Sequence, residues 1–187
     1  TLSSSSAASD VYKRQMIMPR GEPLLMPVNP VFIWASLAAG LAINMLPLGR
    51  VVWMPDLLMV LLVFWGVHQP LRIGMGAAFV LGLCMDVSQS ALLGQHALSY
   101  TVLSFGAIAI HRRLLWFSVP SQALQVFPLF AIAHAIELML RMAAGGIFPG
   151  FWSFLAPFLE ALLWPLASWV LLAPQRRPPD SDQNRPL

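Results

Sequence analysis

The stretch Val119–Leu140, VPSQALQVFPLFAIAHAIELML, is long and apolar enough to cross a membrane as a helix. A helix rises about 1.5 Å per residue, so about 20 apolar residues span a hydrocarbon layer roughly 30 Å thick. Five further apolar stretches, two of them short, are separated by brief connectors: Val31–Leu48, Val51–Val67, Ile73–Val87, Leu98–Ile110 and Phe151–Leu172. The sequence therefore predicts an all-α integral membrane protein, a bundle of six transmembrane helices.

The composition favours the same class. Charged residues make up 10% of the 187 residues and the mean hydropathy is +0.71, whereas a soluble domain carries roughly 25% charged residues. The pI of 9.8 is explained by Lys and Arg in the connectors, so no nucleic-acid partner is expected. Cys84 is the one cysteine, which excludes an internal disulfide and a zinc site built from cysteines.

The ends of the chain differ from its middle. Residues 1–15 are rich in Ser and Ala and then polar, and we expect a leader that is disordered or not native. Residues 16–30 are predicted to form a cytoplasmic N-terminal segment, and residues 31–173 the six-helix transmembrane domain. Residues 174–187 are rich in Pro, Arg and Asp, which is typical of a disordered tail.

The distribution of basic residues predicts the orientation. Six spans place both termini on one side, and cytoplasmic termini put nine of the 11 basic residues inside: Lys13, Arg14, Arg20, Arg72, Arg112, Arg113, Arg176, Arg177 and Arg185. Arg50 and Arg141 remain outside. Because cytoplasmic connectors carry an excess of Lys and Arg, both termini are predicted to be cytoplasmic.

Ionisable side chains within the predicted spans need a physical reason to be there. They are Asp56, Asp86, Glu137, Arg141 and Glu160. A charged group at the bilayer centre costs roughly 2.5–3.5 kcal/mol, and such residues usually face a partner or a functional site. The predicted orientation places most of them towards the outer face. Glu160 lies about 13 Å deep, and we expect it to be protonated or hydrogen-bonded to a neighbouring helix.

A structural and a functional interpretation are open for these residues. Asp56 can begin a helix, and Asp86 can cap the loop that follows it. Glu137 and Arg141 are four residues apart with the acid first, a spacing that favours an ion pair on one helix face. His134, one turn earlier, is expected to be a packed histidine. The functional alternative is that the charged side chains contact a partner near the outer membrane surface.

One predicted helix carries a strip of small residues. Ala78, Gly82 and Asp86 recur every four residues, which places them on one helix face. Small residues let helix backbones approach closely in lipid. The strip predicts tight helix packing, either within the chain or with a partner.

Catalytic signatures are missing from the sequence. It contains no HExxH, no G-x-S-x-G, no glycine-rich phosphate loop, and no His, Asp and Glu set at metal-ligand spacing. We therefore expect a protein that is not an enzyme and that uses no cofactor or metal.

Three short motifs follow one another in the first half of the chain. They are Met54–Leu58, which contains Pro-Asp, Gly82–Asp86, which reads Gly-Leu-x-x-Asp, and Leu93–Leu98, which reads Leu-Gly-x-x-Ala-Leu and contains Gly94. Trp65, Pro70 and Gly74 lie between these motifs, and Tyr100 follows the last one. In order and spacing, over about a third of the chain, they resemble the rod shape-determining protein MreD family. No such motif falls in the last two spans, so the resemblance assigns no role to Glu137, Arg141 or Glu160.

The resemblance implies a non-enzymatic component of the bacterial inner (plasma) membrane that serves cell-wall elongation. Its implied partners are the bitopic protein MreC, the actin-like MreB, and the glycosyltransferase and transpeptidase that build lateral peptidoglycan. The family is also thought to resemble, in fold, the six-helix substrate-binding subunits of vitamin transporters. The alternative is therefore a membrane subunit that binds a small molecule for transport.

Overall fold

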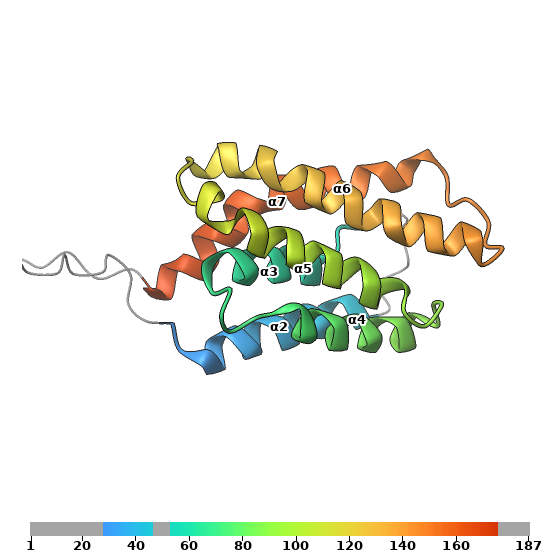
Figure 1. The fold of residues 1–187 in the computed structure, drawn as a ribbon, viewed down its shortest axis with the longest axis horizontal. Helices are drawn as coiled ribbons and strands as arrows, with labels where there is room; N and C mark the ends of the chain where they lie inside the picture. Colours follow the sequence, from blue (N-terminus) through green and yellow to red (C-terminus); the bar gives the residue numbers. More distant parts are fainter. Residues whose placement is uncertain (1–27, 47–52, 176–187) are drawn as a thin grey trace, which may run out of the picture. The chain divides into compact units, whose positions relative to one another are not determined.

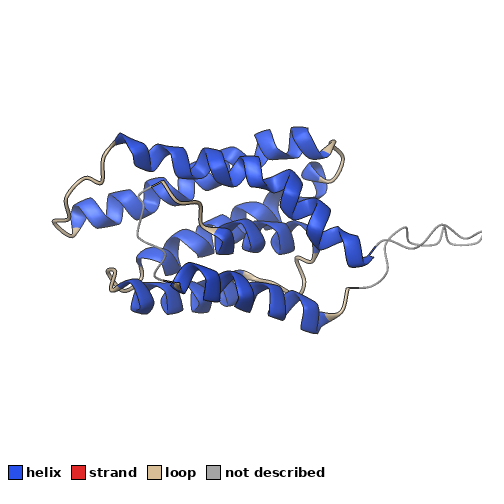
Figure 2. Ribbon diagram, turned by 180° about the vertical axis from the view of Figure 1, so that it is seen from behind, coloured by secondary structure: helices blue, strands red, loops and turns tan. Residues whose placement is uncertain are grey.

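The computed structural model describes residues 28–46 and 53–175, and this part of the chain contains helices and no strands (Figures 1 and 2). The α-helices are α2 (Pro30–Met45), α3 (Leu57–His68), α4 (Met75–Gln89), α5 (Gln95–Leu114), α6 (Val119–Ala143) and α7 (Leu155–Leu172), and two 3-10 turns are η1 (Phe151–Phe154) and η2 (Ala173–Gln175). The predicted leader, and nearly all of the predicted terminal segments 16–30 and 174–187, lie outside the described residues.

The all-α class and the six helices are confirmed, but the predicted start of the second helix is wrong. That helix was expected to begin at Val51, whereas α3 begins at Leu57 and has 12 residues. Pro55 offers no N–H donor, and Asp56 adopts an extended backbone with φ −83° and ψ 102°. Residues 53–56 are therefore not helical and lead into the start of α3.

Two of the segments are long and apolar enough to cross a membrane, namely α6 and Phe151–Gln175. Shorter apolar helices are α2, α3 and α4. Large apolar side chains point outwards from the long helices: Leu124 and Met139 on α6 are 75% and 70% exposed, and Leu162 on α7 is 65% exposed. Apolar side chains on both the inner and the outer faces of a helix are typical of helices surrounded by lipid.

The helix α3 forms the core. It packs against α2, α5 and α7, and its buried residues include Leu58, Phe64, Trp65 and most of those between them. The indole N–H of Trp65 donates to the Ser36 hydroxyl on α2 over 2.8 Å, so the largest side chain of the core also has a polar partner. The position of α3 explains why its sequence is apolar on every side.

The strip of small residues on α4 faces α5. Ala78, Gly82 and Asp86 are buried, and a Cβ at position 82 would lie 2.4 Å from the Cα of Ala97 on α5. The predicted tight packing therefore occurs within the chain. Asp86 also bonds to the start of α5, so Gly82 and Asp86 both contact this helix.

Candidate functional site

The carboxylate of Asp56 caps the start of α3. One oxygen, Oδ1, accepts the backbone N–H groups of Leu58 at 2.8 Å and Met59 at 3.1 Å. Such a cap satisfies backbone donors that the first turn of a helix cannot bond internally. The structural interpretation of Asp56 as a helix start is thus confirmed.

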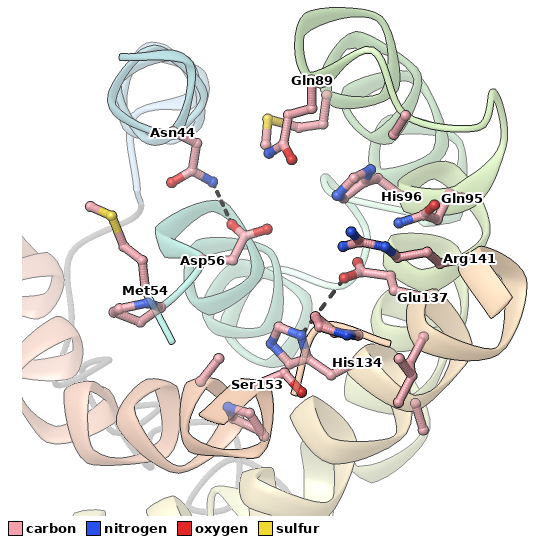
Figure 3. A pocket seen from close by; sticks show the side chains of 18 of the residues that line it. Asn44, Met54, Asp56, Gln89, Gln95, His96, His134, Glu137, Arg141 and Ser153 are labelled. Atoms are coloured by element: carbon pink, nitrogen blue, oxygen red, sulfur yellow. Dashed lines mark hydrogen bonds and ion pairs between the residues drawn. The ribbon is translucent and has the colours of Figure 1, made fainter. Parts of the chain in front are cut away.

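The same carboxylate also joins α3 to two other helices. The side-chain amide of Asn44 on α2 donates to Oδ1 of Asp56 (Figure 3). The phenol of Tyr100 on α5 donates to Oδ2. Tyr100 is fully buried. A half-buried carboxylate with four donors around it is well satisfied, so Asp56 holds α2, α3 and α5 together at one end of α3.

Glu160 connects the start of α3 to α6 and α7. Its Oε1 atom accepts the backbone N–H of Asp56 at 2.9 Å and lies 2.8 Å from Nε2 of His134 on α6. Its side chain is fully buried, and its Oε2 atom has no hydrogen-bond partner among the described residues. The predicted hydrogen bond between Glu160 and a neighbouring helix is confirmed.

Glu137 forms a hydrogen bond to α5 and an ion pair with His134 on its own helix. The Ser99 hydroxyl of α5 donates to Oε1 of Glu137 over 2.6 Å, while Nδ1 of His134 lies 3.7 Å from Oε2. The predicted ion pair between Glu137 and Arg141 is wrong, because none of the ion pairs among the described residues joins these two side chains. His134 is not merely packed, because its two ring nitrogens face two different carboxylates.

Asp86 caps the helix that follows it. Its carboxylate accepts the backbone N–H groups of Gly94 at 2.8 Å, His96 at 2.7 Å and Ala97 at 3.4 Å. It also lies 2.8 Å from Nδ1 of His96. Gly94 has a φ of 101°, in the left-handed region that glycine enters without steric cost. The structural interpretation of Asp86 as a cap for the next segment is confirmed.

Together these contacts form one network, which we call the polar cluster, and it joins the start of α3 to α2, α5, α6 and α7. Its members are Asn44, Asp56, Ser99, Tyr100, His134, Glu137 and Glu160. The Asp86–His96 pair lies beside it, with the His96 ring 6.0 Å from that of Tyr100. The described residues contain no group of three His, Cys, Asp or Glu side chains placed to hold a metal ion. The contacts of the polar cluster orient helices.

Sequence reasoning missed two members of the polar cluster, Asn44 and Ser99. Each is a polar residue within an apolar stretch, and that feature was available as a signal. Uncharged polar residues cost less free energy to place in lipid than charged ones, so one of them in an apolar stretch does not by itself indicate an interhelical contact. Their role depends on which helices are neighbours, and the sequence does not contain that information directly.

Comparison with known proteins identifies the family. The family model described as "rod shape-determining protein MreD" matches residues 26–174, which include every helix described above. The chain is also similar to the "Rod shape-determining protein MreD" of Haemophilus influenzae, with 29% identity over 130 residues, 67% of this chain and 76% of the relative. No solved structure matches the chain. The chain belongs to the family of rod shape-determining proteins MreD.

Proposed function

We propose that the chain is a scaffold subunit of the cell-wall elongation machinery in the bacterial inner membrane, without catalytic activity of its own. In this proposal it crosses the membrane six times, with both termini in the cytoplasm. It binds MreC and thereby works with MreB and with the glycosyltransferase and transpeptidase of lateral peptidoglycan synthesis. The observation that carries the proposal is the family match over residues 26–174, because membership implies a role in determining rod shape.

The contacts of the polar cluster support a binding role rather than a chemical one. Asp56 is occupied by backbone caps and by donors from two helices, and Glu160 bonds to the start of α3 and to α6. Interhelical hydrogen bonds of this kind hold membrane helices in fixed positions. A rigid bundle of this type can present constant outer faces to other membrane proteins.

The surface offered to partners in this proposal is the apolar outer face of the long helices. Leu124, Met139 and Leu162 are all largely exposed, whereas Ala78, Gly82 and Asp86 are buried. Contact with the membrane-spanning part of MreC would then bury apolar side chains of α6 or α7, and it would not use the small-residue strip. Packing between helices in lipid depends on this kind of shape complementarity.

Depletion of the protein in a rod-shaped bacterium tests the proposal. We expect depleted cells to become round and to recover rod shape when the intact gene is supplied, and we expect the protein to co-purify with MreC. A transporter subunit would give a different result, namely cells of normal shape with a nutrient requirement that added nutrient relieves. Rod shape that persists after complete depletion would refute the scaffold role.

A further inference from the structure

The polar cluster borders a large cavity. Its volume is about 1220 Å³, somewhat larger than the roughly 300–1,000 Å³ usual for ligand pockets. The ionisable and amide side chains in its lining include Asp56, Gln95, His96, His134, Glu137 and Arg141. Figure 3 shows the side chains of Gln95, His96, Glu137 and Arg141 entering it from α5 and α6. The cavity is thus open to a molecule larger than a single ion.

Two opposite charges on α6 line the cavity without neutralising each other. The Arg141 carbonyl accepts the backbone N–H of Gly146 over 2.9 Å, whereas its guanidinium lines the cavity and has no hydrogen bond or ion pair among the described residues. Glu137 uses Oε1 for the Ser99 hydroxyl, and its Oε2 atom forms an ion pair with Nδ1 of His134 at 3.7 Å, a distance too long for a hydrogen bond. The two residues are one helical turn apart, which separates their Cβ atoms by roughly 5–6 Å. Oε2 of Glu137 can therefore still accept a hydrogen bond from a ligand, and the Arg141 guanidinium can donate to one.

Further donors near Arg141 favour a phosphate as the anionic group. His96 lines the cavity with Nδ1 held by Asp86 at 2.8 Å, and in its protonated form it has a second N–H, at Nε2, to donate to a ligand. The side-chain amide of Gln95 lines the same wall. Arginine binds phosphate through two parallel hydrogen bonds, and a phosphate has further oxygens for the histidine and the amide. A carboxylate, with two oxygens, would leave some of these donors unused.

We propose that this cavity binds a zwitterion that carries an ammonium group and a phosphate. The phosphate contacts Arg141 with Gln95 and His96, and the ammonium contacts Oε2 of Glu137. The neighbouring carboxylates bond within the protein: Asp56 accepts from Asn44, Leu58 and Tyr100, and Glu160 from the Asp56 backbone with His134 beside it. This site goes beyond the scaffold role and does not depend on it.

The same chemistry has two sources in a bacterial membrane, a zwitterionic lipid headgroup and a soluble amino-phosphate. Apolar side chains such as Met45, Phe127 and Phe154 also line the cavity, so the acyl chains of a lipid would find apolar contacts beside the polar wall. The experiment below separates the two sources.

The test uses the full chain purified in detergent, with phosphoethanolamine as the probe. We expect the probe to raise the midpoint of thermal unfolding in a saturable way, and ethanolamine or inorganic phosphate alone to raise it less. Arg141→Gln and Glu137→Gln should each weaken the apparent affinity about tenfold or more, since each removes a charge-assisted contact. Arg113→Gln removes a positive charge outside the cavity and should leave the affinity unchanged.

Reconstitution into nanodiscs then identifies the source. Loss of phosphoethanolamine binding in phosphatidylethanolamine discs, with binding retained in phosphatidylglycerol discs, indicates that the lipid headgroup fills the site. Binding in both indicates a soluble zwitterion. The proposal is overturned if phosphoethanolamine stabilises the protein no more than ethanolamine or inorganic phosphate does. It is also overturned if Arg141→Gln binds phosphoethanolamine as tightly as the unchanged protein. Arg141 is exposed and its guanidinium is unpaired among the described residues, so its replacement is expected to fold.

Discussion

Replacing Gly82 by alanine is expected to destabilise the protein by about 2–3 kcal/mol, the cost of overpacking a closely packed contact. The added Cβ would lie 2.4 Å from the Cα of Ala97, 2.6 Å from its nitrogen and 2.7 Å from the carbonyl oxygen of His96. All three are backbone atoms of α5, so α4 and α5 must separate to admit a methyl group. That separation would also pull Asp86 away from the start of α5, which it caps. Thermal unfolding in detergent measures the loss.

The matched control for this substitution is Gly76→Ala on the same helix. A Cβ at position 76 meets nothing within 4 Å, and alanine is a better helix former than glycine. We expect Gly76→Ala to leave stability unchanged or slightly raised. If Gly82→Ala proved as stable as Gly76→Ala, the close approach of α4 and α5 would be incorrect.

Asp56→Ala is expected to be similarly damaging, at about 2–4 kcal/mol. The change removes a helix cap, usually worth about 1 kcal/mol. It also leaves the half-buried Asn44 amide and the buried Tyr100 phenol without an acceptor, and a buried unpaired donor such as the phenol costs roughly 1–3 kcal/mol. The lower part of this range allows for the modest strength of interhelical hydrogen bonds measured in membranes. The unfolding midpoint of the purified protein is again the measurement.

Asn29→Ala is the control that shows how much of the stability lost in Asp56→Ala comes from helix capping and how much from the contacts with Asn44 and Tyr100. Asn29 caps α2 by accepting the backbone N–H of Val31 at 2.9 Å, and it is exposed. Its loss should therefore cost only the capping contribution of about 1 kcal/mol. Equal losses for Asn29→Ala and Asp56→Ala would mean that the contacts from Asn44 and Tyr100 contribute nothing to stability.

The sequence was sufficient to predict the helices because a membrane helix is recognised from the length and the apolar composition of a stretch alone. Pro55 and Asp56 together contained the signal for the true start of α3, yet the apolar residues before them favoured a longer helix. The buried strip on α4 was also visible from its spacing. Whether it met a partner or another helix of the chain depended on the position of α5, which the periodicity of α4 does not specify.

The contacts of the polar cluster could not be predicted from the spacing of residues within one helix. Glu137 and Arg141 have the spacing of a helical ion pair, but Ser99 on α5 offers Glu137 a hydroxyl at 2.6 Å. A contact of this kind, 38 residues distant in the sequence, follows from the packing of α5 against α6. Likewise the pairing of His134 with Glu160 requires α6 and α7 to be neighbours. Charged residues were found from the sequence, and their partners were not.

The sidedness of α5 tests the proposed six-span arrangement most directly, because this helix separates two connectors predicted to lie on opposite sides of the membrane. Leu93 and Trp116 are exposed at its two ends, and Leu93→Cys and Trp116→Cys can be made in a Cys84→Ser background. A membrane-impermeant maleimide added to intact spheroplasts is expected to label Leu93→Cys and to label Trp116→Cys only after the membrane is permeabilised. Labelling of both positions from the same side would contradict the arrangement.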